Sequence, residues 1–171
     1  NNFIKYKGLK FGKSLIEKDS EKTISKIYDQ LNNSACKIIL PTDFVVSNNI
    51  NGTPIAKNQE NIEDEDIILD IGVETLKKIH MTINNSKTVM WNGPAGYFEN
   101  KKFAKGTIAI AEMITDNTMR KSLTSIVGGG DTVSAIKNSG LNANFTHLST
   151  AGGAFLEYIE GKNLPGIEVL K

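Results

Sequence analysis

The stretch 125–133, SIVGGGDTV, constrains the fold more than any other part of the chain. A short apolar run leads into three glycines, and a helical pattern follows. Glycines at a strand exit allow a sharp turn and the close approach of a ligand, because no Cβ stands in the way. Asp131 or Thr132 can cap the helix, whose free N–H groups form the positive end of a dipole. A strand, a glycine loop and a helix N-terminus together predict a phosphate site.

The same stretch fits neither of the common nucleotide-binding patterns. It contains no GxxxxGK[ST] motif and therefore no P-loop lysine. Val133 stands where the dinucleotide pattern has its third glycine. A tight strand-to-helix turn without a ligand stays open as an alternative, and so does a role for Asp131 as an N-cap only.

Short apolar runs alternate with amphipathic helical patterns along the whole chain. Strands are predicted at residues 37–41, 43–47, 66–72, 88–91, 125–127 and 145–150, with a closing edge strand in 164–170. Helices are predicted at residues 20–34, 103–114, 132–139 and 151–161, and residues 48–66 are expected to be irregular. A further helix after residue 72 is predicted to carry Leu76, Ile79, His80 and Ile83 on one face. This alternation is typical of an α/β fold, a three-layer sandwich with a mostly parallel, Rossmann-like sheet. We expect one domain over residues 1–171, with the loops 91–96, 127–132 and 149–154 meeting at one sheet edge.

Composition and charge exclude several classes of protein. The net charge of +1 gives no global field for nucleic acid or an anionic membrane, and no apolar run approaches a membrane span. Cys36 has no cysteine partner, so we expect a buried thiol in a reducing, cytoplasmic setting. His80 is expected to be a partly buried core histidine and His147 to be structural. Lys13 and Lys105 are expected to be solvated.

Several segments together resemble phosphoglycerate kinase. The main ones are WNGPAGYFE at 91–99, GGGDT at 128–132 and STAGGA at 149–154. Supporting segments are LPTD at 40–43, DIG at 70–72, FAKGT at 103–107 and EGKNLPG at 160–166. Each is weak alone, but they occur in family order over essentially the whole chain, which makes the set specific.

The resemblance implies the C-terminal, nucleotide-binding lobe of such an enzyme, truncated at its N-terminus. The family transfers a phosphoryl group between 1,3-bisphosphoglycerate and ADP, giving 3-phosphoglycerate and ATP. The phosphoglycerate would bind to the N-terminal lobe, and a lysine-bearing strand and a second glycine-rich loop would precede Asn1. We therefore expect weak ADP or ATP binding, no useful turnover by this chain alone, and a monomer.

The resemblance also implies which residues bind the phosphates. Gly129 and Gly130 would bring backbone N–H groups to them, and Thr132 would hold the adjacent phosphate. Asp131 would be an oxygen ligand for the Mg²⁺ of the nucleotide.

The transferred phosphoryl group would meet donors from a further loop. Gly152 and Gly153 would present N–H groups to it, with Gly130 as the third catalytic donor. Ala151 stands where the family usually has a first glycine, so this loop must turn without a glycine there.

For the nucleoside, the resemblance implies a separate set of residues. Glu99 would accept the ribose hydroxyls, while Gly72 and Leu15 would form part of the adenine slot. The wall beside the sugar and phosphates would consist of Asn92, Pro94, Gly96 and Tyr97. Tyr97 replaces a smaller apolar residue and is expected to reshape this pocket.

Other interpretations of these residues stay open. A dinucleotide-binding oxidoreductase domain would fit the α/β alternation. Such a domain has a G-x-G-x-x-G turn near its first strand, and this sequence lacks that turn. A non-catalytic α/β interaction module would use the fold only as a scaffold. Glu99 could simply stabilise the next helix N-terminus, and for Trp91 and Pro94 packing and a turn are sufficient explanations.

Overall fold

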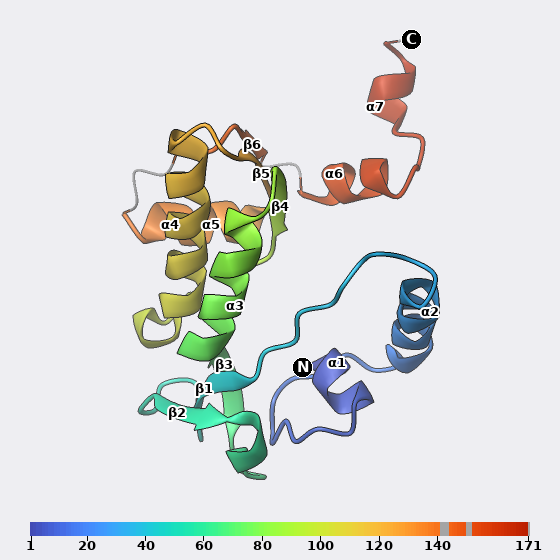
Figure 1. The fold of residues 1–171 in the computed structure, drawn as a ribbon. Helices are drawn as coiled ribbons and strands as arrows, with labels where there is room; N and C mark the ends of the chain where they lie inside the picture. Colours follow the sequence, from blue (N-terminus) through green and yellow to red (C-terminus); the bar gives the residue numbers. More distant parts are fainter. Residues whose placement is uncertain (141–143, 150–151, 171) are drawn as a thin grey trace. The chain divides into compact units, whose positions relative to one another are not determined.

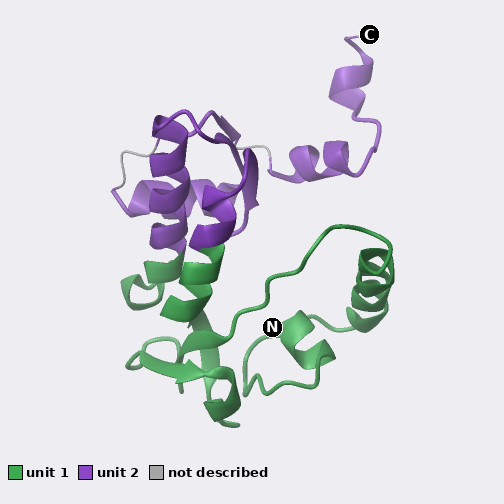
Figure 2. Cartoon of the chain, in the orientation of Figure 1, with its two compact units in different colours: residues 1–79, 95–106 green, residues 80–94, 107–171 purple. Residues whose placement is uncertain are grey.

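The computed structural model describes residues 1–140, 144–149 and 152–170. The chain forms two compact units (Figure 2). Unit 1 consists of Asn1–Ile79 and Ala95–Gly106, and unit 2 consists of His80–Pro94 and Thr107–Lys171. The expected single nucleotide-binding domain over residues 1–171 stays a prediction.

Strands and α-helices alternate over residues 67–159, whereas two α-helices and then two strands follow one another before residue 67 (Figure 1). The α-helices are α1 (Asn2–Tyr6), α2 (Glu21–Leu31), α3 (Val73–Asn84), α4 (Lys105–Met119), α5 (Gly130–Asn138), α6 (Gly152–Ile159) and α7 (Pro165–Glu168). The strands are β1 (Asp43–Ser47), β2 (Ile55–Asn58), β3 (Ile67–Ile71), β4 (Thr88–Asn92), β5 (Thr124–Gly128) and β6 (His147–Ser149). Two short 3₁₀ helices are η1 (Gln59–Asn61) and η2 (Lys101–Phe103). Each described helix falls short of the length or apolar character that crossing a membrane requires.

Unit 1 is built on an antiparallel sheet in the order β2-β1-β3. The central strand β1 alternates side chains between two faces, and Phe44 and Val46 point into the core. They pack with Ile4 of α1 and with Ile62, all at most 3% exposed. This core fixes β3, which carries Asp70 into the interior at 2% exposure.

Unit 2 is built on a parallel sheet in the order β4-β5-β6. The hydroxyl of Thr118 on α4 donates a hydrogen bond to Ser125 Oγ on β5 at 2.8 Å, which joins this helix to the sheet. The inner face predicted for residues 103–114 is buried at every position, namely Phe103, Thr107, Ile110, Ala111 and Ile114. The α/β class and its parallel sheet are thus confirmed, while unit 1 contributes antiparallel strands that the apolar runs did not distinguish.

Three predicted segments differ from the structure. Residues 37–41 form no strand, because β2 and β3 occupy both edges of β1, and Leu40 and Pro41 line a cavity instead. The segment expected to be irregular contains β2, which pairs with β1. The predicted closing strand is replaced by α7, which begins at Pro165, whose fixed φ suits a first helical turn.

Predictions for single residues also need correction. Cys36 is exposed, because the apolar run beside it joins neither sheet nor core. His80 is exposed, and a ring nitrogen pairs with Asn84 Nδ2 at 3.2 Å. Helix α5 begins at Gly130, so Gly129 occupies the N-cap position that was expected for Asp131 or Thr132.

Candidate functional site

The three parallel strands of unit 2 end at the same level. Asn92, Gly128 and Ser149 are the last residues of β4, β5 and β6, and they are register partners across the sheet. The segments that follow therefore leave from one edge, where ligands bind in open parallel sheets. The predicted convergence is confirmed for residues 92–94, 128–132 and 152–153, while Thr150 and Ala151 lie outside the described residues.

Two of the glycines are required by contacts between these segments. A Cβ on Gly152 would lie 2.5 Å from the Cα of Gly129, closer than packed atoms can come. Gly129 has φ +95°, a backbone conformation that residues other than glycine rarely adopt. A Cβ added to it would lie 3.0 Å from Asn92 Oδ1. Glycine at these positions lets the backbones of Gly129 and Gly152 touch and lets Gly129 lie against the side chain of Asn92.

The buried side chain of Thr132 joins two of the segments. Its Oγ1 accepts the N–H of Gly93 at 2.7 Å, and the residue has 0% exposure. Gly93 has φ +104°, and its carbonyl accepts the indole N–H of Trp91 at 2.8 Å. Trp91 is 8% exposed and packs as expected. The Thr132 hydroxyl oxygen therefore fixes the turn after β4 from inside the protein.

Gly130 and Gly153 differ from their neighbours because space is open beside them. A Cβ on either would meet no atom of the described residues within 4 Å, and both residues lie in the first turn of a helix. The earliest bond of the α5 ladder runs from Val133 N–H to Gly129 C=O at 3.0 Å. The N–H groups of residues 130–132 precede that bond and form the positive end of the helix dipole. This arrangement suits the oxygens of an anion.

Asp131 supplies the carboxylate at this edge. It is exposed in the first turn of α5. Among the described residues, no three His, Cys, Asp or Glu side chains gather into a metal cage. A single carboxylate fits Mg²⁺, which commonly takes one or two protein oxygens and completes its shell with phosphates and water.

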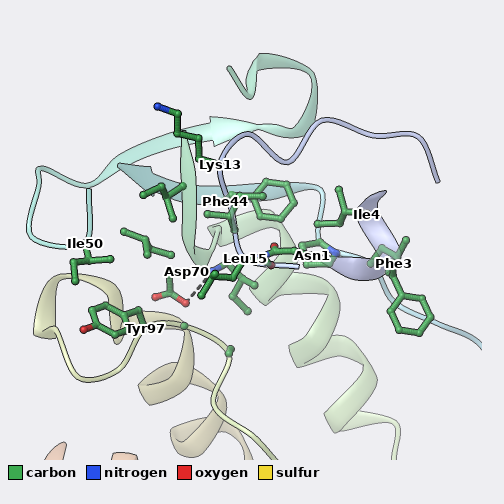
Figure 3. A pocket seen from close by; sticks show the side chains of 17 residues that line it. Asn1, Phe3, Ile4, Lys13, Leu15, Phe44, Ile50, Asp70 and Tyr97 are labelled. Carbon is green, nitrogen blue, oxygen red and sulfur yellow. Dashed lines mark hydrogen bonds between the residues drawn. The ribbon is translucent and has the colours of Figure 1, made fainter. Parts of the chain in front are cut away.

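Unit 1 contains a mostly apolar cavity of about 790 Å³ (Figure 3). Leu15, Gly96 and Tyr97 line it, together with core residues such as Phe44. Leu15 is 89% exposed although it lines the cavity. The N–H of Tyr97 donates to the carbonyl of Leu69 at 2.7 Å, which holds this segment against β3. The structure brings together three of the residues expected around the nucleoside.

Gly72 and Glu99, expected around the nucleoside as well, are placed differently. Gly72 is buried against Asp43, whose carbonyl accepts the Gly72 N–H at 2.8 Å, and the described lining of the cavity does not include it. Glu99 is exposed and starts no helix, because Asn100 occupies the N-cap of η2 and its Oδ1 accepts the N–H of Lys102.

Sequence reasoning assigned no role to Asp70, which the structure places beside this cavity. Its Oδ1 accepts the N–H of Ile71, and its Oδ2 accepts the N–H of Gly106, both at 2.8 Å. Burial raises the pKa of the Asp70 carboxyl to about 6, against the opposing effect of the two hydrogen bonds. An acid inside the apolar run 67–71 was the signal that could have identified it.

Comparison with known proteins identifies the family. A sequence model described as phosphoglycerate kinase matches residues 1–162. The chain belongs to the phosphoglycerate kinase family. Among curated relatives, the phosphoglycerate kinase of Rhodopseudomonas palustris is 44% identical, and that of Wolbachia sp. subsp. Drosophila simulans is 43% identical, each over 173 aligned positions. Both alignments cover 100% of this chain and 44% of the relative, so the chain spans less than half of the length of these phosphoglycerate kinases.

Solved phosphoglycerate kinase structures agree with this assignment. The structure from Coxiella burnetii has a TM-score of 0.91 and 34% identity, covering 100% of this chain and 44% of that chain. The structure from Pyrococcus horikoshii has a TM-score of 0.81 and 28% identity, covering 99% and 42%. The fold described above is therefore similar to part of a phosphoglycerate kinase.

Proposed function

We propose that this chain supplies the ADP- and ATP-binding part of a phosphoglycerate kinase of glycolysis. The whole enzyme would transfer a phosphoryl group reversibly between 1,3-bisphosphoglycerate and ADP, giving 3-phosphoglycerate and ATP. The phosphoglycerate would bind to a partner lobe, and the enzyme would be a cytoplasmic monomer. The observation that carries the proposal is that β4, β5 and β6 end at the same level. Helices α5 and α6, which begin at Gly130 and Gly152, therefore follow β5 and β6 at one edge of the sheet.

Backbone N–H groups would do most of the phosphate binding. Phosphoryl transfer needs correct positioning and donors directed at the transferring oxygens more than covalent help from the protein. Gly129 and Gly130 would donate to the phosphates of the nucleotide, and Gly152 and Gly153 to the transferred group. Thr132 would act from the interior, because its hydroxyl oxygen is engaged by Gly93 N–H.

The nucleoside would be bound by the second set of residues. A flat base needs an apolar slot, and the cavity of unit 1 offers one beside Leu15, Gly96 and Tyr97. Glu99, which is exposed, would accept the ribose hydroxyls. The family resemblance assigns Asn92 and Pro94 to the wall beside the sugar and phosphates, and Gly72 to the adenine slot.

Asp131 would be the protein ligand of Mg²⁺, which enters with the nucleotide. The ion supplies neutralisation of phosphate charge when bound. The carboxylate is exposed beside the open first turn of α5, so ion and phosphate oxygens can reach it together. We expect Asp131→Ala to lower Mg-ADP affinity and to change the unfolding free energy by no more than about 1 kcal/mol, the size of the interaction between a first-turn carboxylate and the helix dipole.

Two glycine substitutions test the proposed phosphate site. Gly130→Ala and Gly153→Ala each add a methyl that meets none of the described residues within 4 Å, and alanine favours the helix by up to about 1 kcal/mol. The folded protein should tolerate both. We expect each to lower Mg-ADP affinity by at least about tenfold, because the methyl occupies space that a phosphate would need. Isothermal titration calorimetry with millimolar Mg-ADP measures this effect.

Gly166→Ala is the matched control. Gly166 also lies in a helix, and a Cβ added to it would meet no atom of the described residues within 4 Å. It is part of α7 and has no proposed role in ligand binding. It should leave Mg-ADP affinity unchanged. Equal affinities for the wild type, both site variants and the control would contradict the proposed phosphate site.

A further inference from the structure

A buried carboxylate connects β3 to the first turn of α4. Asp70 is the fourth residue of β3, and its side chain turns inward at 2% exposure. One oxygen accepts the N–H of the next residue, Ile71, and the other accepts the N–H of Gly106, the second residue of α4. A helix N-terminus favours such an acceptor, because its first N–H groups lack partners within the helix.

The segment 95–106 returns to this carboxylate at both ends. A Cβ on Gly96 would lie 2.4 Å from Asp70 Oδ1, and a Cβ on Gly106 would lie 2.2 Å from the same atom. Glycine is therefore required where the segment starts and where it joins α4. Between these contacts, Tyr97 N–H binds the carbonyl of Leu69, the residue before Asp70. One side chain thus abuts both ends of a segment that carries Gly96, Tyr97 and Glu99.

We propose that Asp70 is a positioning residue that holds the segment 95–99 in place for the nucleoside part of the nucleotide. The inference rests on the proposed function, since it takes that segment as the nucleoside site. Asp70 itself need not touch the ligand. Its two acceptor oxygens fix β3 and α4 at the distance that this segment must bridge.

The charged groups near Asp70 are compatible with an ionised carboxylate. Lys102 and Lys105 line a smaller cavity of about 350 Å³ together with Asp70, and Lys13 shares the larger cavity with it. With a pKa of about 6, the Asp70 carboxyl is mostly ionised at neutral pH and can accept both N–H hydrogen bonds.

The test separates nucleoside binding from phosphate binding. Asp70→Asn keeps the shape but turns one acceptor oxygen into a donor, which then faces a backbone N–H. Calorimetric titrations of the chain with Mg-ADP and, separately, with magnesium and inorganic pyrophosphate should then diverge. We expect ADP affinity to fall about tenfold while pyrophosphate affinity stays within about twofold. A purely structural loss would weaken both ligands alike.

A second variant displaces the carboxylate without changing it. Gly106→Ala places its methyl against Asp70 Oδ1, so the carboxylate must shift to make room for it. It should give the same divergence between the two ligands. Asp66→Asn is the control, because Asp66 is also a buried acid of unit 1, paired with Lys57 at 2.8 Å and accepting the Glu63 N–H at 2.7 Å. It should lower stability and leave the ratio of the two affinities unchanged.

The wild type provides a readout that does not depend on any variant. Hydrogen exchange at the N–H groups of Gly106 and Tyr97 should slow when ADP binds and stay unchanged with pyrophosphate. The role of Asp70 is overturned if folded Asp70→Asn or Gly106→Ala keeps the wild-type ratio of ADP to pyrophosphate affinity. It is also overturned if bound ADP leaves the exchange of the Gly106 and Tyr97 N–H groups unchanged. Failure of the wild type to bind any ADP overturns the proposed function itself, and this inference with it.

Discussion

At the scale of single residues, Asp70 makes stability depend on pH in an unusual direction. Burial raises the pKa of this carboxyl from 3.8 to about 6, although two N–H hydrogen bonds oppose the rise. The folded state therefore binds more protons than the unfolded state between these values. Its contribution to the unfolding free energy falls as pH rises through this window. The pKa difference corresponds to about 3 kcal/mol lost by pH 7.

Urea unfolding between pH 4 and pH 7 checks this prediction. The wild type should lose stability relative to Asp70→Asn over that range, since asparagine does not titrate. The difference between the two proteins should level off above pH 7. Parallel stability curves across the window would contradict the raised pKa of Asp70.

The residue scale also shows where sequence reasoning succeeded and failed at the candidate site. The glycines 129, 130, 152 and 153 could be singled out because glycine runs at strand exits have few other uses. The bond from Gly93 N–H to Thr132 could not be predicted, since its partners lie 39 positions apart and no local spacing links them. The acid inside the apolar run 67–71 marked Asp70 as unusual, but its bond to Gly106 could not be predicted because the two residues are distant in sequence.

At the scale of elements, Asp43 holds the N-terminus of α3. Its carboxylate accepts the N–H groups of Glu74 and Thr75 at 2.8 and 2.7 Å, and the Thr75 hydroxyl at 2.6 Å. Burial raises the pKa of Asp43, but these hydrogen bonds outweigh it and leave the pKa below 3.8. The stabilisation is therefore present above the ordinary pKa and is lost as pH falls below it.

Asp43→Ala tests this capping role. We expect the variant to lose about 1 to 2 kcal/mol of unfolding free energy at pH 7, as helix caps do. Guanidinium unfolding at pH 7 and at pH 2.5 measures the change, and the gap should narrow at the lower pH. Asp64→Ala, on the exposed surface of the same unit, serves as a control with little expected effect. A gap that widens in acid would contradict the lowered pKa.

Elements with a strong period were predictable, and those that depend on distant partners were not. Helix α4 followed from one apolar face of residues 103–114, which is buried as expected. Strand β2 has few apolar residues and exists through its pairing with β1. The apolar run 37–41 had the composition of a strand, but no unpaired sheet edge was left for it beside β1.

At the scale of the whole molecule, the chain covers 44% of the length of related phosphoglycerate kinases. The proposed reaction needs the phosphoglycerate held opposite the nucleotide. We therefore expect this chain alone to bind Mg-ADP weakly and to show no measurable turnover. An assay coupled to ATP formation from 1,3-bisphosphoglycerate checks the prediction, with an intact phosphoglycerate kinase as the positive control. Turnover by the chain alone above the background of the assay would refute it.

Because β4, β5 and β6 end at the same level, the proposed phosphate site is built mainly from the backbone that follows these strands. Most of its donors are peptide groups, which neither gain nor lose protons in the range where enzymes work. A change of pH should therefore alter the binding of the phosphates mainly through the ionisation of the ligand itself. Side chains elsewhere can change without weakening the binding of the phosphates, provided that the three strands still end at the same level.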